Sequence, residues 1–256
     1  MTVTLFGAIT GILVGMTGSG GGALLTPLLL VFTPYPVLTV IGTDLVTGVV
    51  TKLIGFVQHW RFGPIYWRLA GYIILGSLPG SLAGIGLIHV LKANLSTAHL
   101  DASLKGFVGL ALFAASASLP YVRKKGLAES GQSVQPRRLS HGGTVAVGCA
   151  VGFLVAVTSV GSGSLLMVFM LLVVPLPISE LVGTDIMLGL TTTVLAGSLH
   201  LWMGHFSEQL FGELALGSIP GVIAGSWLSH RIPERYFSWL LSFLYFSLGA
   251  RLLLSW

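Results

Sequence analysis

The sequence predicts an all-α polytopic membrane protein built from two homologous four-segment repeats. Three observations support this fold class: few charged residues, long apolar segments and an internal duplication. Of the 256 residues, 54% are hydrophobic and 8% are charged, whereas a soluble domain carries about 25% charged residues. So few charges exclude a soluble enzyme, a nucleic-acid-binding domain and any large domain outside the membrane. At about 20 apolar residues per crossing, the length allows about eight transmembrane segments.

The two repeats become visible when the chain is compared with itself at an offset of 141 residues. Between residues 7–89 and 148–230, 30 of 83 aligned positions are identical. We therefore predict a first transmembrane repeat at residues 1–121 and a second at residues 143–256. The landmarks in register are Gly-Thr-Asp at 42–44 and 183–185, Pro-x-Pro at 34–36 and 175–177, and Gly-Ser-x-Pro-Gly at 76–80 and 217–221.

Each repeat contains four apolar segments, and a basic linker separates the repeats. The linker, residues 122–142, carries five Lys and Arg residues among Gly, Ser, Gln and Pro. Because basic residues are enriched in cytoplasmic loops of membrane proteins, we expect this linker to face the cytoplasm. The apolar segments cover residues 4–32, 36–58, 70–91 and 103–121 in the first repeat, and 144–174, 178–203, 211–229 and 236–256 in the second.

The first segment of each repeat is predicted to be broken near its middle. A single helix over residues 4–32 would be about 43 Å long, against a hydrocarbon core of about 30 Å. Its centre at residues 18–22 is Gly-Ser-Gly-Gly-Gly, which disfavours helix, and Ser-Val-Gly-Ser-Gly stands at residues 159–163. Each segment is therefore either a tilted helix with an unwound centre or a re-entrant hairpin that enters and leaves on one side.

The distribution of basic residues bears on this choice. If each repeat crosses the membrane four times, the repeats are parallel, and the Lys and Arg residues divide nine against four between the two sides. If the first segments are hairpins, the repeats are inverted and the division is ten against three. The difference is one residue, so it leans towards inversion and leaves both topologies open. Inverted repeats with broken helices near the midplane are a common plan among transporters.

The glycine-rich breaks are candidate anion sites. Non-helical backbone at membrane depth is tolerated only where protein buries it or it lines a cavity. A helix that restarts there presents free N–H groups and a positive dipole end, which suit an anion. The candidate substrate-binding residues are Thr17, Ser19, Gly20, Gly21 and Gly22 in the first repeat, and Thr158, Gly161, Ser162, Gly163 and Ser164 in the second. The alternative role, close helix packing, is the one we predict for Gly7, Gly11, Gly15, Gly148 and Gly152.

Asp44 and Asp185 are the acidic residues that lie well inside apolar segments, and they occupy equivalent positions. An ionisable group within a membrane helix is a functional candidate because leaving it unpaired is costly. The two carboxylates either couple transport to a proton or sodium ion, act as a charge gate, or accept backbone N–H bonds at a helix start. Lys52 lies two helical turns after Asp44 and either pairs with it or faces the anion. Its counterpart is Thr193, so this role belongs to one repeat.

The sequence predicts no catalytic group, metal site or cofactor. Cys149 is the one cysteine, which excludes an internal disulfide and a cysteine metal cluster. The recurring histidines, such as His59 and His200, are expected to be structural. Because no nucleophile stands with a base, we expect that the protein is not an enzyme.

These motifs resemble the sulfite exporter TauE/SafE family over nearly the whole chain. The resemblance rests on the Pro-x-Pro, Gly-Thr-Asp and Gly-Ser-x-Pro-Gly copies and on the opening motif Gly11-x3-Gly15-x2-Gly18-x-Gly20-Gly21-Gly22-x2-Leu25-x-Pro27. The second copy has Val168 in place of the proline. The resemblance implies a permease of the inner membrane that exports sulfite or a small organosulfonate.

We therefore expect a secondary transporter for a small inorganic or organic sulfur anion, working by alternating access in the lipid bilayer. Asp44, Asp185 and Lys52 are the predicted coupling or gating residues, with H+ or Na+ as coupling ion. The alternatives are a passive anion channel and a non-transporting membrane scaffold. No nucleic-acid partner is expected, and the apolar faces are compatible with a monomer or a homodimer.

Overall fold

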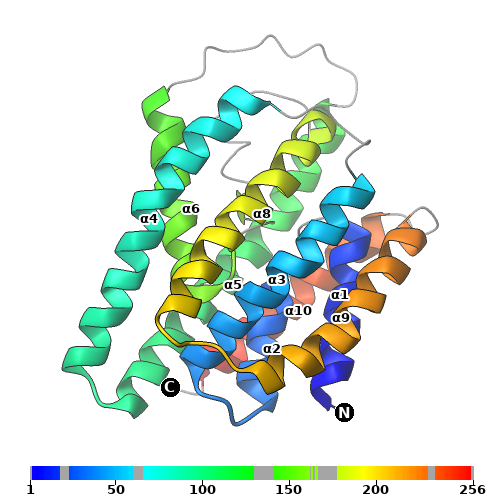
Figure 1. Cartoon of the computed structure of the whole chain (residues 1–256). Coiled ribbons are helices and arrows are strands. Elements are labelled where there is room, and N and C mark those ends of the chain that lie inside the picture. Colours follow the sequence, from blue (N-terminus) through cyan, green and yellow to red (C-terminus); the bar gives the residue numbers. More distant parts are fainter. Residues whose placement is uncertain are drawn as a thin grey trace.

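A computed structural model of the chain describes residues 2–17, 23–59, 66–129, 141–161, 163, 165–166, 178–229 and 234–254. Within these residues the regular structure is helical, as predicted, with nine helices and no strand (Figure 1). They are α1 (Thr2–Thr17), α2 (Leu25–Phe32), α3 (Val37–His59), α4 (Trp67–Asn94), α5 (Thr97–Glu129), α6 (His141–Thr158), α8 (Ile178–Trp202), α9 (Glu208–Ser229) and α10 (Glu234–Leu254).

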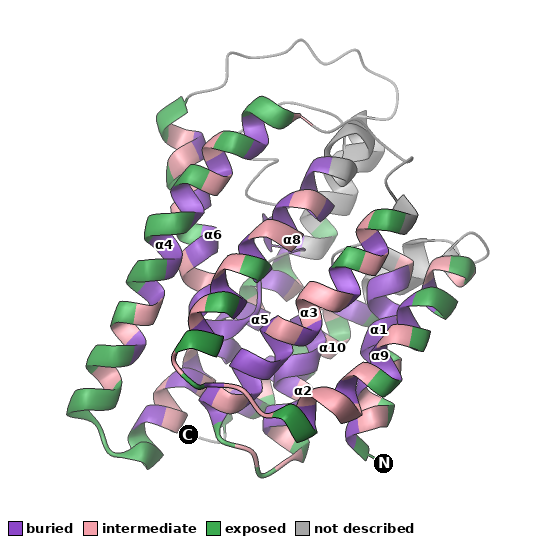
Figure 2. Cartoon of the chain, viewed as in Figure 1, coloured by how far each residue is buried: buried purple, intermediate pink, exposed green. Residues whose placement is uncertain are grey.

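Several of these helices can cross a membrane. Five of the described ones, α3, α4, α5, α6 and α9, contain a sufficiently long and apolar stretch, and α1 and α10 contain shorter apolar stretches. Large apolar side chains such as Leu216, Trp227 and Phe243 are exposed, and Figure 2 shows exposed residues along the outward sides of the helices. Lipid rather than water is the solvent that accepts such a surface, so the chain is a multi-pass membrane protein.

The first segment is not one continuous helix. Helix α1 ends at Thr17 and α2 begins at Leu25, with the glycine-rich residues 18–22 outside the described part of the chain. The ring of Phe32 at the end of α2 lies 5.5 Å from the ring of Phe6 near the start of α1. The segment therefore returns to the side from which it started, which agrees with the hairpin alternative.

Two helix pairs are packed through glycine faces. Helix α1 packs on α9, and α4 packs on α6. A Cβ atom at Gly7 would lie 2.7 Å from the carbonyl oxygen of Leu214, and one at Gly221 would lie 2.6 Å from that of Ala8. Only glycine permits such close backbone approach. The packing role predicted for five glycines is confirmed, because the backbone of the partner helix lies against each of them: Gly7, Gly11, Gly15, Gly148 and Gly152.

Helices at equivalent positions in the two repeats pack on each other in opposite directions. Between α3 and α8, Gly197 lies against Leu45, and Thr193 contacts both Gly48 and Lys52, so one helix ascends as the other descends. Between α5 and α10, Phe113 stacks edge-on to Phe246 at 5.2 Å, and the Ser116 hydroxyl bonds the Ser242 carbonyl at 3.0 Å. Both pairs run antiparallel, and α3 and α8 lie side by side in the middle of the bundle (Figure 1).

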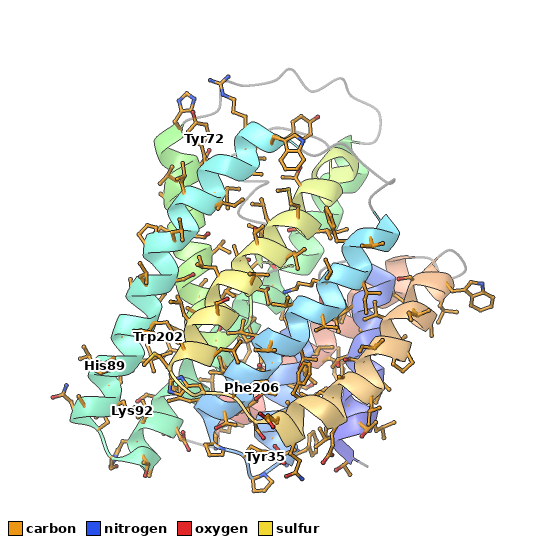
Figure 3. All side chains as sticks on the ribbon, viewed as in Figure 1. Tyr35, Tyr72, His89, Lys92, Trp202 and Phe206 are labelled. Carbon is orange, nitrogen blue, oxygen red and sulfur yellow. The ribbon has the colours of Figure 1, made fainter. Side chains whose placement is uncertain are left out.

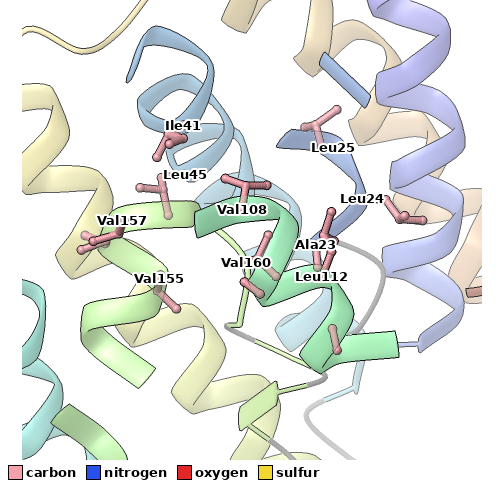
Figure 4. Close-up of a cluster of buried hydrophobic side chains, with 14 of the residues drawn as sticks. Ala23, Leu24, Leu25, Ile41, Leu45, Val108, Leu112, Val155, Val157 and Val160 are labelled. Carbon is pink, nitrogen blue, oxygen red and sulfur yellow. The ribbon is translucent and has the colours of Figure 1, made fainter. Parts of the chain in front are cut away.

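The apolar core holds the broken segments in the centre of the molecule. Ala23 and Leu24, before α2, are buried together with Val160, beyond the end of α6. Figure 4 shows these side chains gathered around α3 and α5, beside Ile41 and Leu112. This cluster fixes the start of α2 and the end of α6 next to the middle of α3, where the buried charges lie.

One boundary differs from the expectation for the linker. Helix α5 continues to Glu129, so the first eight residues of the predicted 122–142 linker are helical, and α6 begins at His141. Residues 122–129 contain a single glycine and no proline, so nothing in them stops the helix. Residues 130–140 lie outside the described part of the chain.

Candidate functional site

The structure describes only part of the predicted glycine-rich anion site. Ser19, Gly20, Gly21, Gly22, Ser162 and Ser164 lie outside the described residues, and Thr17 is described only as the last residue of α1. Their assignment as substrate ligands stays a prediction.

The break after α6 is described through Gly161 and again at Gly163, which is buried. The Thr158 hydroxyl donates to the Leu154 carbonyl at 2.6 Å and accepts the Val160 N–H at 3.1 Å. Thr158 is fully buried. Its hydroxyl bonds backbone groups at the end of α6, and it does not line the cavity beside Lys52. Ser159 has φ +59° and Gly161 has φ +118°, so the chain turns sharply here.

Asp44 joins this break to the break in the other repeat. Its Oδ2 atom accepts the Ser159 hydroxyl at 2.8 Å and also the Thr26 hydroxyl. The backbone N–H of Thr26, in the first turn of α2, donates to the same carboxylate. A carboxylate at a helix N-terminus satisfies free N–H groups and the helix dipole. Asp44 thus lies at the start of α2 rather than of its own helix, and its role in coupling, gating or structure stays a prediction.

The threonine of each Gly-Thr-Asp copy accepts a hydrogen bond from the backbone of the other repeat. The Ser207 N–H, just before α9, donates to the Thr43 hydroxyl at 3.1 Å. At the equivalent positions, the Tyr66 N–H, just before α4, donates to the Thr184 hydroxyl at 3.0 Å. Gly42 lies directly against the carbonyl of His205, where any side chain would collide. These contacts join segments far apart in the chain, so no local sequence pattern predicts them.

Lys52 is buried at the contact between α3 and α8. It is 4% exposed, and its Nζ donates to the Thr193 hydroxyl at 2.6 Å. The carboxylates of Asp44 and Asp185 both attract its charge. Thr193 is the residue equivalent to Lys52 in the second repeat, 141 positions later. The two equivalent side chains therefore touch.

A small cavity with polar and apolar walls lies beside Lys52. Helices α1, α3, α8 and α9, the start of α2 and the end of α6 contribute to it. The α3 residues repeat at spacings of three and four, as one helix face requires. From that spacing in the sequence, Thr47 and Thr51 could have been predicted to lie on the same helix face as Asp44 and Lys52. The lining residues are Thr10, Gly11, Val14, Leu25, Asp44, Thr47, Gly48, Thr51, Lys52, Ser159, Thr193 and Ser218.

The buried histidines, His200 and His205, bond other protein groups and do not line the cavity. The Nε2 atom of His200 lies 2.8 Å from the Ala156 carbonyl, and its Nδ1 atom lies 3.3 Å from that of His205. His89 and Lys92 stand on the last turns of α4, at one end of the bundle (Figure 3). No cluster of three His, Cys, Asp or Glu side chains suited to a metal ion occurs within the described ranges.

Comparison with known proteins matches residues 3–252 to the sulfite exporter TauE/SafE family. The chain is 36% identical to the probable membrane transporter protein YjnA of Bacillus subtilis, over 99% of both chains. It is 25% identical to the probable membrane transporter protein YdhB of the same organism, over 91% of this chain and 92% of that one. It is 23% identical to a probable membrane transporter protein of Haemophilus influenzae, over 89% and 85%. No solved structure matches the chain.

Proposed function

The chain belongs to the sulfite exporter TauE/SafE family of membrane transporters, and we propose that it is a secondary transporter that exports sulfite or a small organosulfonate across the inner membrane. The observation that carries the proposal is the buried ammonium group of Lys52 in a hydroxyl-lined cavity. A cation held inside a membrane protein is costly unless it is paired or used. An anion entering from the cavity would meet that charge at membrane depth.

The chemistry of the cavity suits a small oxyanion. Lys52 supplies one charged donor and Ser218 a hydroxyl group, and the hydroxyls of Thr10, Thr47 and Thr51, which bond carbonyl oxygens of their own helices, line the same cavity and could rotate towards an anion. Charge-assisted hydrogen bonds of this kind replace the hydration of an anion. Val14 and Leu25 give the same cavity an apolar wall, which a short carbon chain of a sulfonate could contact.

The helix packing supports inverted repeats. Equivalent helices α3 and α8 run antiparallel, as do α5 and α10, whereas α1 and α9 run parallel, like α4 and α6. A two-fold axis in the membrane plane relates elements in this way. Because Lys52 touches its own counterpart Thr193, this residue pair would lie beside that axis. The proposed substrate site is therefore at the interface of the repeats.

This arrangement also supports alternating access. The glycine-packed pairs α1–α9 and α4–α6 would move as two rigid units on either side of α3 and α8. Rocking of one unit would open the cavity to one side of the membrane, and rocking of the other would open it to the opposite side. Asp44, which links α2, α3 and the end of α6, would gate this movement.

The test is anion flux in proteoliposomes, with sulfite and methanesulfonate as probes. Saturable flux is expected from the wild type, and Lys52→Gln should reduce it by about 100-fold, because the charged ligand is lost. Lys92→Gln, which removes an exposed lysine on α4, is the matched control and should leave flux unchanged. In the same assay Gly21→Val tests the predicted glycine-rich ligands, and normal flux from that variant would remove them from the site.

Three outcomes would contradict the proposal. Normal flux from folded Lys52→Gln would move the substrate site elsewhere. Flux that does not saturate would indicate a passive channel. Absence of flux with both probes would leave the membrane fold intact but exclude this class of substrate.

A further inference from the structure

Three buried charged side chains lie near the contact of α3 and α8, and their charges do not balance. Asp44, Lys52 and Asp185 are 4%, 4% and 1% exposed. In the part of the chain that the structure describes, no further Asp, Glu, Lys or Arg side chain is buried. One ammonium group therefore faces two carboxylates at a depth where an uncompensated charge is costly.

Hydrogen-bond donors beside Asp44 offset part of the cost of burying its charge. Two hydroxyl groups, of Thr26 and Ser159, and the backbone N–H of Thr26 all donate to this carboxylate. Hydrogen bonds donated to a carboxylate stabilise its charge. These donors also hold the start of α2 against the end of α6, so the negative charge of Asp44 is part of the architecture.

The second repeat carries different residues at the positions equivalent to the hydroxyl donors of Asp44. Thr26 and Ser159 correspond to Met167 and Gly18, which carry no hydroxyl group and lie outside the described residues. The two copies of the aspartate therefore differ in sequence at these positions, and Lys52 is shared between the two carboxylates.

Other titratable groups on the helices packed against α8 are exposed, lie against α4 or are bonded to the backbone. Arg68, at the start of α4, is exposed, as are His89 and Lys92 near the end of that helix (Figure 3). On α6, His141 is the exposed first residue, and Cys149 lies against Gly76 and Gly80 of α4. On α8 itself, His200 bonds the Ala156 carbonyl.

We propose that Asp185 is the proton-binding site of the transporter and that its protonation accompanies anion binding, while Asp44 stays ionised. This inference rests on the transport function proposed above. Ionised Asp185 competes with the anion for the charge of Lys52. Protonated Asp185 leaves that charge to the anion in the cavity, so proton and anion bind together and travel in the same direction. With a dianion such as sulfite, one negative charge moves outward, which an inside-negative membrane potential favours.

The test measures proton uptake when the purified protein binds methanesulfonate. This probe keeps the same charge across the working range, so any proton taken up belongs to the protein. Titrations in weakly buffered solution with a pH indicator should give about one proton per bound anion for the wild type. Reciprocally, the Kd should rise by about tenfold per pH unit above the titration of the site.

Asp185→Asn and Asp44→Asn form a matched pair of isosteric variants at equivalent positions. Asp185→Asn should bind the anion without proton uptake and with a Kd independent of pH. Asp44→Asn should keep proton uptake for whatever anion it still binds, while losing thermal stability because its donors lose a charged acceptor. Asp185→Glu, which keeps a titratable group, should restore proton uptake.

The outcomes separate this inference from the transport function. Anion binding by the wild type without proton uptake would overturn the role of Asp185 and leave the anion site standing. Proton uptake that survives Asp185→Asn but disappears in Asp44→Asn would assign the proton to the other carboxylate. Absence of methanesulfonate and sulfite binding at every pH would overturn both. Because the wild-type measurement decides the first outcome, poor folding of a variant does not block the test.

Discussion

The two Gly-Thr-Asp copies share one role and differ in another. In both, the threonine hydroxyl accepts a backbone N–H group of the opposite repeat, just before α9 for Thr43 and just before α4 for Thr184. The positions that donate to Asp44, by contrast, are not kept, because Thr26 and Ser159 correspond in sequence to Met167 and Gly18. The duplication has therefore kept its framework contacts, while the residues at the positions that donate to Asp44 differ between the repeats.

The same division runs through the rest of the cavity. Framework glycines recur, so Gly11 and Gly152 both pack on the backbone of the opposite repeat. Lining residues diverge: Thr10, Thr47 and Lys52 of the first repeat stand where the second has Val151, Leu188 and Thr193. Other polar lining residues, Asp44, Thr51 and Ser218, are identical to their counterparts Asp185, Thr192 and Ser77, so the repeats differ on only part of the polar side of the site.

The largest expected effect comes from moving the lysine between repeats. Lys52→Thr should abolish transport and lower the free energy of unfolding by about 3 kcal/mol, because removing one partner leaves buried carboxylates uncompensated. Since Lys52 and Thr193 touch, the double variant Lys52→Thr/Thr193→Lys should recover part of both. Proteoliposome flux and thermal unfolding are the measurements. A double variant no better than Lys52→Thr would mean that the two positions are not interchangeable.

A smaller effect is expected from giving the first repeat the apolar residues of the second. Thr10→Val and Thr47→Leu should each raise KM for the anion by about tenfold, because a lost hydrogen bond to a charged group costs about 1.5 kcal/mol. Both variants should fold, since the second repeat carries these residues at equivalent positions. Thr191→Val on α8, away from the cavity, is the control and should transport normally. Unchanged KM in both lining variants would place the anion away from these hydroxyls.

The smallest effect concerns the loop before α9, where His205 stands and the first repeat has Pro64. Burial, followed by the nearby His200 and Lys92, lowers the pKa of His205 to about 4. Protonation of His205 therefore favours the unfolded chain, in which a histidine has a pKa of about 6.5. Stability is thus fully present above about pH 6.5 and is lost as pH falls towards 4. Thermal unfolding across this range should show a shallower loss for His205→Gln, and equal slopes would contradict the assignment.

Sequence patterns predicted the elements of this protein better than the contacts between them. The apolar segments, the glycine-rich break after Thr17 and the packing glycines follow from local composition and spacing. The bond from Ser159 to Asp44 joins residues 115 positions apart, and no periodicity encodes such a pairing. Comparison of the two repeats identified Asp44 and Lys52 as candidate residues. Their neighbours, however, depend on how the two repeats pack together, which the sequence does not show.

The glycine-packed helices have a consequence for synthesis and insertion. Gly15 of α1 accepts the hydroxyl of Ser226 on α9, 211 residues further along the chain. The ribosome therefore delivers α1 to the membrane long before its partner exists. Until α9 is inserted, the glycine face of α1 must be covered by lipid, an insertase or another nascent helix. Correct assembly of the first helix consequently waits for nearly the whole polypeptide to be translated.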